Sequence, residues 1–419
     1  MHYFTYKNKK LYCEDVSVEQ IAQAVGTPFY CYSYRTLTEH FIKLKRAFAS
    51  IKPLICFSMK SNSNQAVLHS LIKKGAGLDI VSGGELFRGM KAGCNPRKIV
   101  YAGVGKTEKE LADAIKRGVL LFNVESIQEL ETISRISRRY NITTQVSLRV
   151  NPDVKADTHE YITTAKAENK FGINIPIVEK ICLKASSFSH VAIVGLHIHI
   201  GSQIVTAAPF IQAIKKVLAF MDTMKKQGIY FTYLNIGGGL GIVYKNETPQ
   251  TAEEFAKRVI PMVRGRGYRI ILEPGRFIAG NSGIFVTKVT YVKRGTKKDF
   301  LIVDGGMNDL IRPSLYNAYH EIYPVVQNKN RARSVFDVVG PICESGDFLA
   351  KERELPQFNA GELMALLGAG AYGFTMSSNY NSRPRVAEVL VKGKKFAVVR
   401  KRETYTDLVK GETIPSFVK

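Results

Sequence analysis

The feature that most constrains the fold is a repeated alternation along the chain of apolar, β-type runs and charged stretches with helical spacing. Stretches such as NQAVLHSLIKKG and SIQELETISRISRRY place apolar residues three and four apart, which is typical of amphipathic helices. Continuous apolar strands that alternate with such helices indicate a parallel sheet covered by helices. Eight such units over roughly 220 residues match the count and length of a (β/α)₈ barrel. The eight runs are ICFSM (55–59), LDIVS (78–82), IVYAG (99–103), LFNVES (121–126), VSLRVN (146–151), VGLHIHIG (194–201), YLNIGGG (233–239) and RIILEPG (269–275).

The pattern changes after about residue 280, where short strand-like segments are separated by glycine and charged turns. We interpret this part as a second, mainly antiparallel β domain. We therefore predict an α/β chain with three parts: an N-terminal segment, 1–33, that packs with the β domain; a barrel over 34–280; and the β domain over 281–419.

The charge balance raises the possibility of a nucleic-acid partner, because 60 Lys and Arg stand against 36 Asp and Glu, a formal net charge of +24. The basic residues, however, fall in short scattered groups, without aromatic residues interleaved in an RNA-binding pattern. We interpret them as a solvated surface and predict no nucleic-acid partner. The groups are KNKK (7–10), RGRGYR (264–269), KRGTKK (293–298) and RKR (400–402).

Hydropathy and cysteine spacing exclude other classes. No apolar run reaches 18 residues, and the first 20 residues do not resemble a secretory signal, so we expect neither a membrane span nor export. The six cysteines lie far apart and form no CxxC pair, which argues against a zinc ribbon, a metal site and a disulfide framework. A reducing cytoplasmic location is the simplest interpretation.

Residues suited to chemistry follow the predicted barrel strands: Lys60, Asp79, His199, the run Gly237–Gly239 and the turn Glu273–Arg276. The carboxyl ends of barrel strands share one face, and such folds carry their active sites there. Residues far apart in sequence are therefore expected to converge.

Each of these residues also has an ordinary interpretation. A lysine at a barrel mouth is desolvated and suited to a Schiff base, but most lysines simply extend into solvent. The glycines of NIGGGLG (235–241) can expose N–H groups to a phosphate or can merely allow a tight turn. In EPGR (273–276), the acid can keep a heterocyclic nitrogen protonated and the arginine can bind a carboxylate, or the two can form an exposed ion pair.

Two further motifs remain open in the same way. His197 and His199 alternate along a strand, so one of them is expected to face the barrel interior, where a histidine is more often a core residue than a catalyst. Cys343, in GPICESGD (340–347), lies beside a carboxylate, but a single cysteine is usually a buried apolar residue.

Taken together, the motifs resemble one family, the fold-type III PLP-dependent decarboxylases, and within it the diaminopimelate branch. The resemblance covers nearly the whole chain, and the motifs occur in the family's order. They are FSMKSN, LDIVSGGEL, HIHIGSQ, NIGGGLG, EPGR, IRPSLY, GPICESGD and AYGFTMSSNYNSRPR.

The resemblance implies a pyridoxal 5′-phosphate (PLP) cofactor bound covalently by Lys60, with Cys343 as the proton donor. It implies these cofactor-binding residues: Lys60, Asp79, His199, Ser202, Gly239, Glu273, Gly275, Arg276 and Tyr372. It implies these substrate-binding residues: Arg276, Arg312, Tyr316, Glu344 and Tyr372. Cys343 and Glu344 are implied to reach the active site of the neighbouring subunit of a homodimer.

The implied reaction is decarboxylation of meso-2,6-diaminopimelate to L-lysine and carbon dioxide, the last step of lysine biosynthesis by that route. An acid such as Glu273 at the ring nitrogen favours a decarboxylase over a racemase of this fold, since racemases resemble one another in using an arginine there. Arg276 and Arg312 suit a substrate with two carboxylates. The alternatives are a decarboxylase for ornithine, lysine, arginine or carboxynorspermidine, and a catalytically silent or nucleic-acid-binding protein.

Overall fold

The structure is a computed structural model that describes residues 2–154 and 170–418. It divides into two compact units, one formed by Leu37–Ala279 and the other by Met1–Thr36 with Gly280–Lys419. The sequence prediction placed its boundaries after residues 33 and 280. We call these units the barrel unit and the sheet unit.

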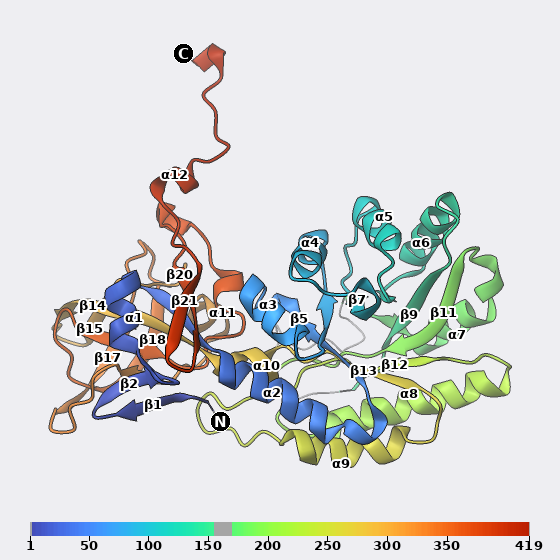
Figure 1. Cartoon of the computed structure of the whole chain (residues 1–419), viewed down its shortest axis with the longest axis horizontal. Helices are drawn as coiled ribbons and strands as arrows, with labels where there is room; N and C mark the ends of the chain where they lie inside the picture. The colour runs from blue at the N-terminus through green and yellow to red at the C-terminus, as the bar shows by residue number, and fades with distance from the viewer. Residues whose placement is uncertain (1, 155–169, 419) are drawn as a thin grey trace. The chain divides into compact units, whose positions relative to one another are not determined.

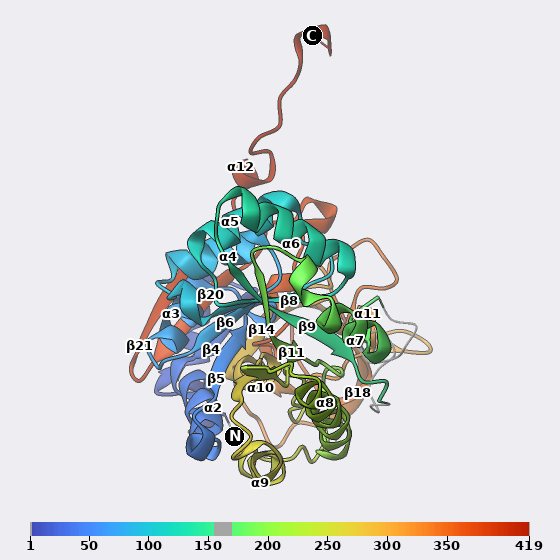
Figure 2. The ribbon, with the colours of Figure 1, turned by 90° about the vertical axis from the view of Figure 1, so that its right-hand side faces the viewer.

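In the described part of the chain, the barrel unit contains eight parallel strands that close on themselves, as predicted for the fold class. The strand order runs β9-β11-β12-β13-β5-β6-β7-β8, and the pairing of β8 with β9 closes the barrel (Figure 2). A two-residue strand, β10 (Ile173–Asn174), is added beside β9. The barrel strands are β5 (Leu54–Ser58), β6 (Gly77–Ile80), β7 (Ile99–Tyr101), β8 (Leu121–Val124), β9 (Thr144–Asn151), β11 (Val191–His197), β12 (Tyr233–Asn235) and β13 (Arg269–Leu272).

Helices follow the strands and lie outside them (Figures 1 and 2). Local sequence explains where several begin: Thr107 and Glu110 form a capping box on α5, Thr251 and Glu254 form one on α9, and Ser126 caps α6. The helices are α2 (Tyr34–Ala47), α3 (Gln65–Ile72), α4 (Gly83–Lys91), α5 (Glu108–Arg117), α6 (Ile127–Arg139), α7 (Ile175–Leu183), α8 (Ala208–Lys226), α9 (Ala252–Val263) and α10 (Arg276–Ala279).

The sheet unit is built around a twisted, mainly antiparallel sheet in the order β18-β17-β15-β14-β4-β20-β21. The N-terminal strand β4 (Phe29–Ser33) is inserted at its centre, antiparallel to β14 and parallel to β20. Two pairs of neighbouring strands in this sheet are therefore parallel, β4 with β20 and β15 with β17. The other strands are β14 (Gly283–Lys293), β15 (Asp299–Val303), β16 (Ile322–Pro324), β17 (Arg333–Val339), β18 (Phe348–Pro356), β19 (Leu363–Leu366), β20 (Ala387–Lys392) and β21 (Lys395–Arg400).

Smaller elements complete this unit. They are the three-stranded sheet of β1 (Phe4–Lys7), β2 (Lys10–Cys13) and β3 (Val16–Ser17), and the helices α1 (Val18–Val25), α11 (Arg312–Tyr316) and α12 (Tyr405–Leu408). The small sheet and α1 share an apolar core with β4, β14 and β20, which includes Leu11, Ile21, Cys31, Val286 and Val389.

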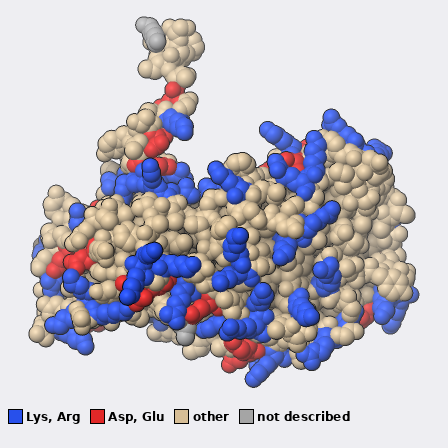
Figure 3. All heavy atoms as spheres, viewed as in Figure 1, with Lys and Arg blue, Asp and Glu red and all other residues tan. Residues whose placement is uncertain are grey.

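The surface carries the chain's positive charge. Figure 3 shows Lys and Arg side chains spread over the visible face, without one dominant patch. Across residues 2–154 and 170–418, no helix combines the length and apolar character needed to cross a bilayer.

Candidate active site

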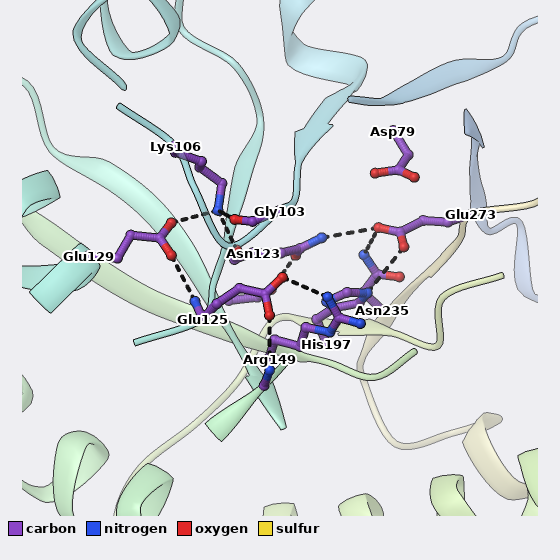
Figure 4. Close-up of polar contacts among 12 residues, drawn as sticks. Asp79, Gly103, Lys106, Asn123, Glu125, Glu129, Arg149, His197, Asn235 and Glu273 are labelled. Atoms are coloured by element: carbon purple, nitrogen blue, oxygen red, sulfur yellow. Dashed lines mark hydrogen bonds and ion pairs between the residues drawn. The ribbon is translucent and has the colours of Figure 1, made fainter. Parts of the chain in front are cut away.

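The centre of the candidate site is a buried carboxylate, Glu273, directly after β13 (Figure 4). Its Oε1 accepts hydrogen bonds from Asn123 Nδ2 at 3.1 Å and Asn235 Nδ2 at 2.6 Å. Its Oε2 lies 3.1 Å from His197 Nε2. These partners come from β8, β12 and β11, and all are buried, so four strands converge on one acid.

These contacts control the charge of Glu273. Burial alone would raise its pKa, but His197, the hydrogen bond from Asn235 and the charge of Lys60 outweigh burial and lower the pKa to about 2. Glu273 is therefore an anion at any physiological pH.

Lys60 lies on the short 3-10 turn Met59–Ser61 that follows β5. Its Nζ is 3.5 Å from Asp79 Oδ2, and its side chain is 38% exposed, so the amine is accessible. Asp79 is buried; Ser58 Oγ donates to its Oδ2 at 2.6 Å, and its Oδ1 has no hydrogen-bond partner within residues 2–154 and 170–418. Burial raises the pKa of Asp79, although Lys60 and Ser58 lower it.

His199 lies just past β11, next to the glycine run. Gly238 N donates to its Nδ1 at 3.3 Å, so the proton of a neutral ring is on Nε2. Burial and the charge of Lys60 hold the pKa of His199 well below its usual value. The ring is therefore uncharged at neutral pH.

The glycine run allows unusually close approach of main chain. A Cβ on Gly238 would lie 2.0 Å from Glu273 O, and one on Gly239, where φ is +101°, would lie 2.2 Å from Gly201 O. Gly275 lies against Ser58 and Ser61, next to Lys60. Glycine is required here to bring three strand ends together.

Arg276 begins α10 and is buried. Its Nη1 donates to Tyr244 Oη at 2.7 Å, and its Nη2 donates to Ser202 Oγ at 3.1 Å. Both of these contacts are to hydroxyl groups, and a buried guanidinium of this kind suits an anion such as phosphate or carboxylate.

A second polar layer lies beside this site (Figure 4). Lys106, whose side chain is fully buried, donates to Glu129 Oε1 at 2.6 Å, Gly103 O at 2.7 Å and Asn123 O at 2.9 Å. A second buried ion pair joins Arg149 to Glu125 at 2.6 Å.

The other predicted site residues belong to the sheet unit. Arg312 is buried on α11, with Nη1 2.8 Å from His320 Nε2, and Tyr316 ends the same helix. Cys343 and Glu344 are exposed in the loop between β17 and β18, and Cys343 N donates to Asn381 Oδ1 at 2.7 Å. Tyr372 is partly buried after β19 and has φ +57°, which is unusual for a side chain of this size.

Several of the ordinary interpretations are wrong. Glu273 and Arg276 are buried, so they are not an exposed loop ion pair, and Cys343 is exposed rather than an inert core thiol. Sequence reasoning missed Asn123 and Asn235 and gave His197 no role. A usable signal existed, because each asparagine interrupts an apolar strand, in LFNV and YLNI.

The fold thus carries a partly exposed lysine, an ionised buried acid and a glycine-rich turn with a buried arginine at the ends of its barrel strands. Residues 34–280 match the family described as pyridoxal-dependent decarboxylases, over their pyridoxal binding domain. The chain therefore belongs to the class of PLP-dependent decarboxylases.

Whole-chain relatives narrow the class. The chain is 48% identical to diaminopimelate decarboxylase of Aquifex aeolicus over 97% of this chain and 96% of the relative. A crystal structure of diaminopimelate decarboxylase from Helicobacter pylori complexed with L-lysine has a TM-score of 0.90 at 40% identity, covering 94% of this chain and 98% of that one. The enzyme from M. jannaschii, in co-complex with L-lysine, has a TM-score of 0.94 at 33% identity, covering 99% of both chains. The chain belongs to the diaminopimelate decarboxylase family.

The residues present fit PLP, the cofactor of this class. Lys60 offers an accessible amine, and Glu273 offers an anion to a protonated ring nitrogen. Uncharged His199 can stack on a cationic ring without repulsion, and Arg276 with the glycine turn suits a phosphate. The unpartnered Oδ1 of Asp79 can accept one further hydrogen bond.

Proposed function

We propose that this chain decarboxylates meso-2,6-diaminopimelate to L-lysine and carbon dioxide. One observation carries the proposal: a buried, anionic Glu273 is held at the barrel mouth that also carries Lys60. Relatives that cover nearly the whole chain are named for this activity, and two of the similar structures are complexes with L-lysine, the product of the proposed reaction.

When bound, PLP supplies a protonated ring that accepts the electron pair left by a departing carboxylate. Glu273 keeps the ring nitrogen protonated, because an anion with a pKa of about 2 stabilises a neighbouring cation. Lys60 provides the amine that binds the cofactor, and Asp79 holds that amine near the strand end. His199 would cover one face of the ring.

Other residues of the site are proposed to bind the phosphate of the cofactor and the carboxylates of the substrate. Gly239, Gly275, Arg276 and Ser202 form the phosphate-binding set, since Arg276 already donates to Ser202 and the glycines admit close approach of the backbone. On the sheet unit, Arg312 is the proposed cation for a substrate carboxylate, and Arg276 also takes part in substrate binding. We assign Tyr316 and Tyr372 to the substrate, and Tyr372 also to the cofactor.

We propose that the enzyme is a homodimer with shared sites. Cys343 Sγ donates the proton that replaces the departing carboxylate, and Glu344 binds the distal ammonium group, both in the partner's site. Their exposure on a single chain supports this assignment. All six cysteines are free thiols, which supports a reducing cytoplasmic location.

The test is carbon dioxide release by PLP-loaded protein, with Lys60→Ala as the matched control. The substrates are meso-diaminopimelate, ornithine, lysine, arginine and carboxynorspermidine. Turnover of meso-diaminopimelate alone, with lysine as product, is expected. Turnover of a different substrate would keep the chemistry and reject the proposed specificity, and no turnover by PLP-loaded protein would reject the activity.

A further inference from the structure

The hydrogen bonds that Glu273 accepts from the described residues leave one of its acceptor positions open. An ionised carboxylate offers about four acceptor positions, two on each oxygen. The two asparagines occupy both positions on Oε1, at 3.1 Å and 2.6 Å, and His197 occupies one on Oε2, at 3.1 Å. Counting the described residues, one position therefore remains, and it is on Oε2, the oxygen that His197 contacts.

The two asparagine donors are fixed by a second contact each. Ser147 Oγ donates to Asn123 Oδ1 at 2.6 Å, and Gly237 N donates to Asn235 Oδ1 at 2.9 Å. Because each amide oxygen is engaged elsewhere, each amide nitrogen must face Glu273.

His197 is fixed in a different way. It is the last residue of β11, 1% exposed, and it pairs in register with Asn235 of β12. Its Nδ1 has no hydrogen-bond partner in the described part of the chain. A proton on Nδ1 would be buried without an acceptor, so the ring carries its proton on Nε2, facing Glu273 Oε2.

We propose that His197 is a positioning residue for the cofactor's ring nitrogen, acting through Glu273. His197 occupies one lone pair of Glu273 Oε2. The other lone pair of Oε2 is then left to accept a hydrogen bond from the ring nitrogen of the cofactor. The inference rests on the proposed function, because it requires that the ring bound here contains a basic nitrogen.

The experiment compares two ligands that differ only at that nitrogen. Apo protein is titrated with PLP and with 1-deazapyridoxal 5′-phosphate, in which a C–H group replaces the ring nitrogen. The variants are His197→Leu, which removes the donor, and His197→Gln, whose amide nitrogen can reach the same place as Nε2. Dissociation constants are measured by visible absorbance.

For His197→Leu, we expect PLP affinity to fall roughly 10- to 100-fold, the range for loss of a hydrogen bond to a charged group. Affinity for the deaza analogue should change less than about threefold, and His197→Gln should restore PLP binding to within about threefold. If affinity for PLP and affinity for the deaza analogue fell equally, His197 would be merely structural and the inference would be overturned. An unchanged affinity for PLP would also overturn it.

Two controls keep the outcomes distinct. If His197→Leu does not fold, His197→Asn, whose shorter side chain holds its amide nitrogen away from the place of Nε2, must show the same split between the ligands. If the wild-type protein binds no PLP, the proposed function fails and the inference fails with it. If the wild-type protein binds PLP but the variants lose affinity for both ligands equally, the proposed function stands and only the role of His197 is rejected.

Discussion

Replacing Lys106 by methionine should destabilise the barrel more than any exposed charge change. The Lys106 side chain is fully buried, and its ammonium group donates to Glu129 Oε1, Gly103 O and Asn123 O. Methionine fills a similar volume but donates nothing. Among residues 2–154 and 170–418, the hydrogen bond from Glu125 N is then the one that the buried Glu129 carboxylate keeps.

The size of the effect follows from the broken pair. Removing one partner of a buried ion pair costs about 3–5 kcal/mol, since the other charge is left without compensation. For a domain of this size, about 2–4 °C of melting temperature corresponds to each kcal/mol, so the barrel transition should fall by roughly 6–20 °C. Differential scanning calorimetry of the apo protein measures that transition separately from the sheet unit if the two unfold independently.

Arg117→Met is the matched control in the same unit, because its pair with Asp113 is 43% and 49% exposed and lies on one helix turn. An exposed pair contributes about 0–1 kcal/mol, so this variant should melt within roughly 4 °C of the wild type. If Lys106→Met also melted within that range, the argument that a desolvated charge is left unpaired would be wrong.

The same variant should respond to pH with a definite sign. Burial raises the pKa of Glu129, whereas Lys106 lowers it, so removing Lys106 raises that pKa further. The folded variant then favours protonated Glu129, and its stability deficit relative to wild type should shrink as pH falls through the raised pKa. A deficit that grew on acidification would contradict this sign.

Three further predictions concern the site. Glu273→Gln should keep the size of the side chain but lose the anion and replace one acceptor oxygen by a donor, so decarboxylation should fall roughly 100- to 1000-fold in a carbon dioxide assay; near-normal turnover would reject the assigned role. Gly239→Ala should destabilise the barrel by more than about 2 kcal/mol by thermal melting, because its Cβ would meet Gly201 O at 2.2 Å, whereas Gly228→Ala, with φ +80° and no atom within 4 Å of its Cβ, isolates the cost of the backbone conformation. Mixing inactive Lys60→Ala and Cys343→Ala chains should restore up to about one quarter of wild-type activity if sites are shared between subunits, since half the random dimers carry one intact site; no recovery would reject shared sites.

The barrel was predictable because its signal is local and repeated. Each of the eight apolar runs overlaps a barrel strand, and the stretches NQAVLHSLIKKG and SIQELETISRISRRY contain α3 and α6. The carboxyl ends of barrel strands share one face, and for that reason the sequence predicts that Lys60 and Glu273 converge.

The sheet unit was harder, because its pairing is non-local. Strand β4 lies between β14 and β20, which are more than 250 residues further along the chain, and nothing in FYCYS specifies that neighbour. The strand β18, FLAKERELP, is rich in charge and has only a partly buried face, so its apolar pattern is weak.

The contacts of Glu273 were missed for the same physical reason. Asn123 donates to an acid 150 residues away, and Lys106 binds Glu129 across 23 residues and two elements. A single sequence shows that a polar residue interrupts an apolar strand, but which partner satisfies it depends on how the barrel closes. The family resemblance identifies Glu273 as a site residue, but its hydrogen-bond partners are known from the structure alone.

The buried acids of the barrel differ in how they are compensated, and this difference points to the cofactor. Glu125 and Glu129 are each paired with a cation of the chain, Arg149 and Lys106 respectively. Glu273 is equally buried, yet in the described structure its hydrogen bonds come from two amides and an imidazole rather than from lysine or arginine. The amides, His197 and the charge of Lys60 already keep Glu273 ionised, so its open position on Oε2 can accept a hydrogen bond from a group that brings a cation. A protonated ring nitrogen is such a group, and we therefore expect Glu273 to favour binding of the cofactor in the protonated form that decarboxylation needs.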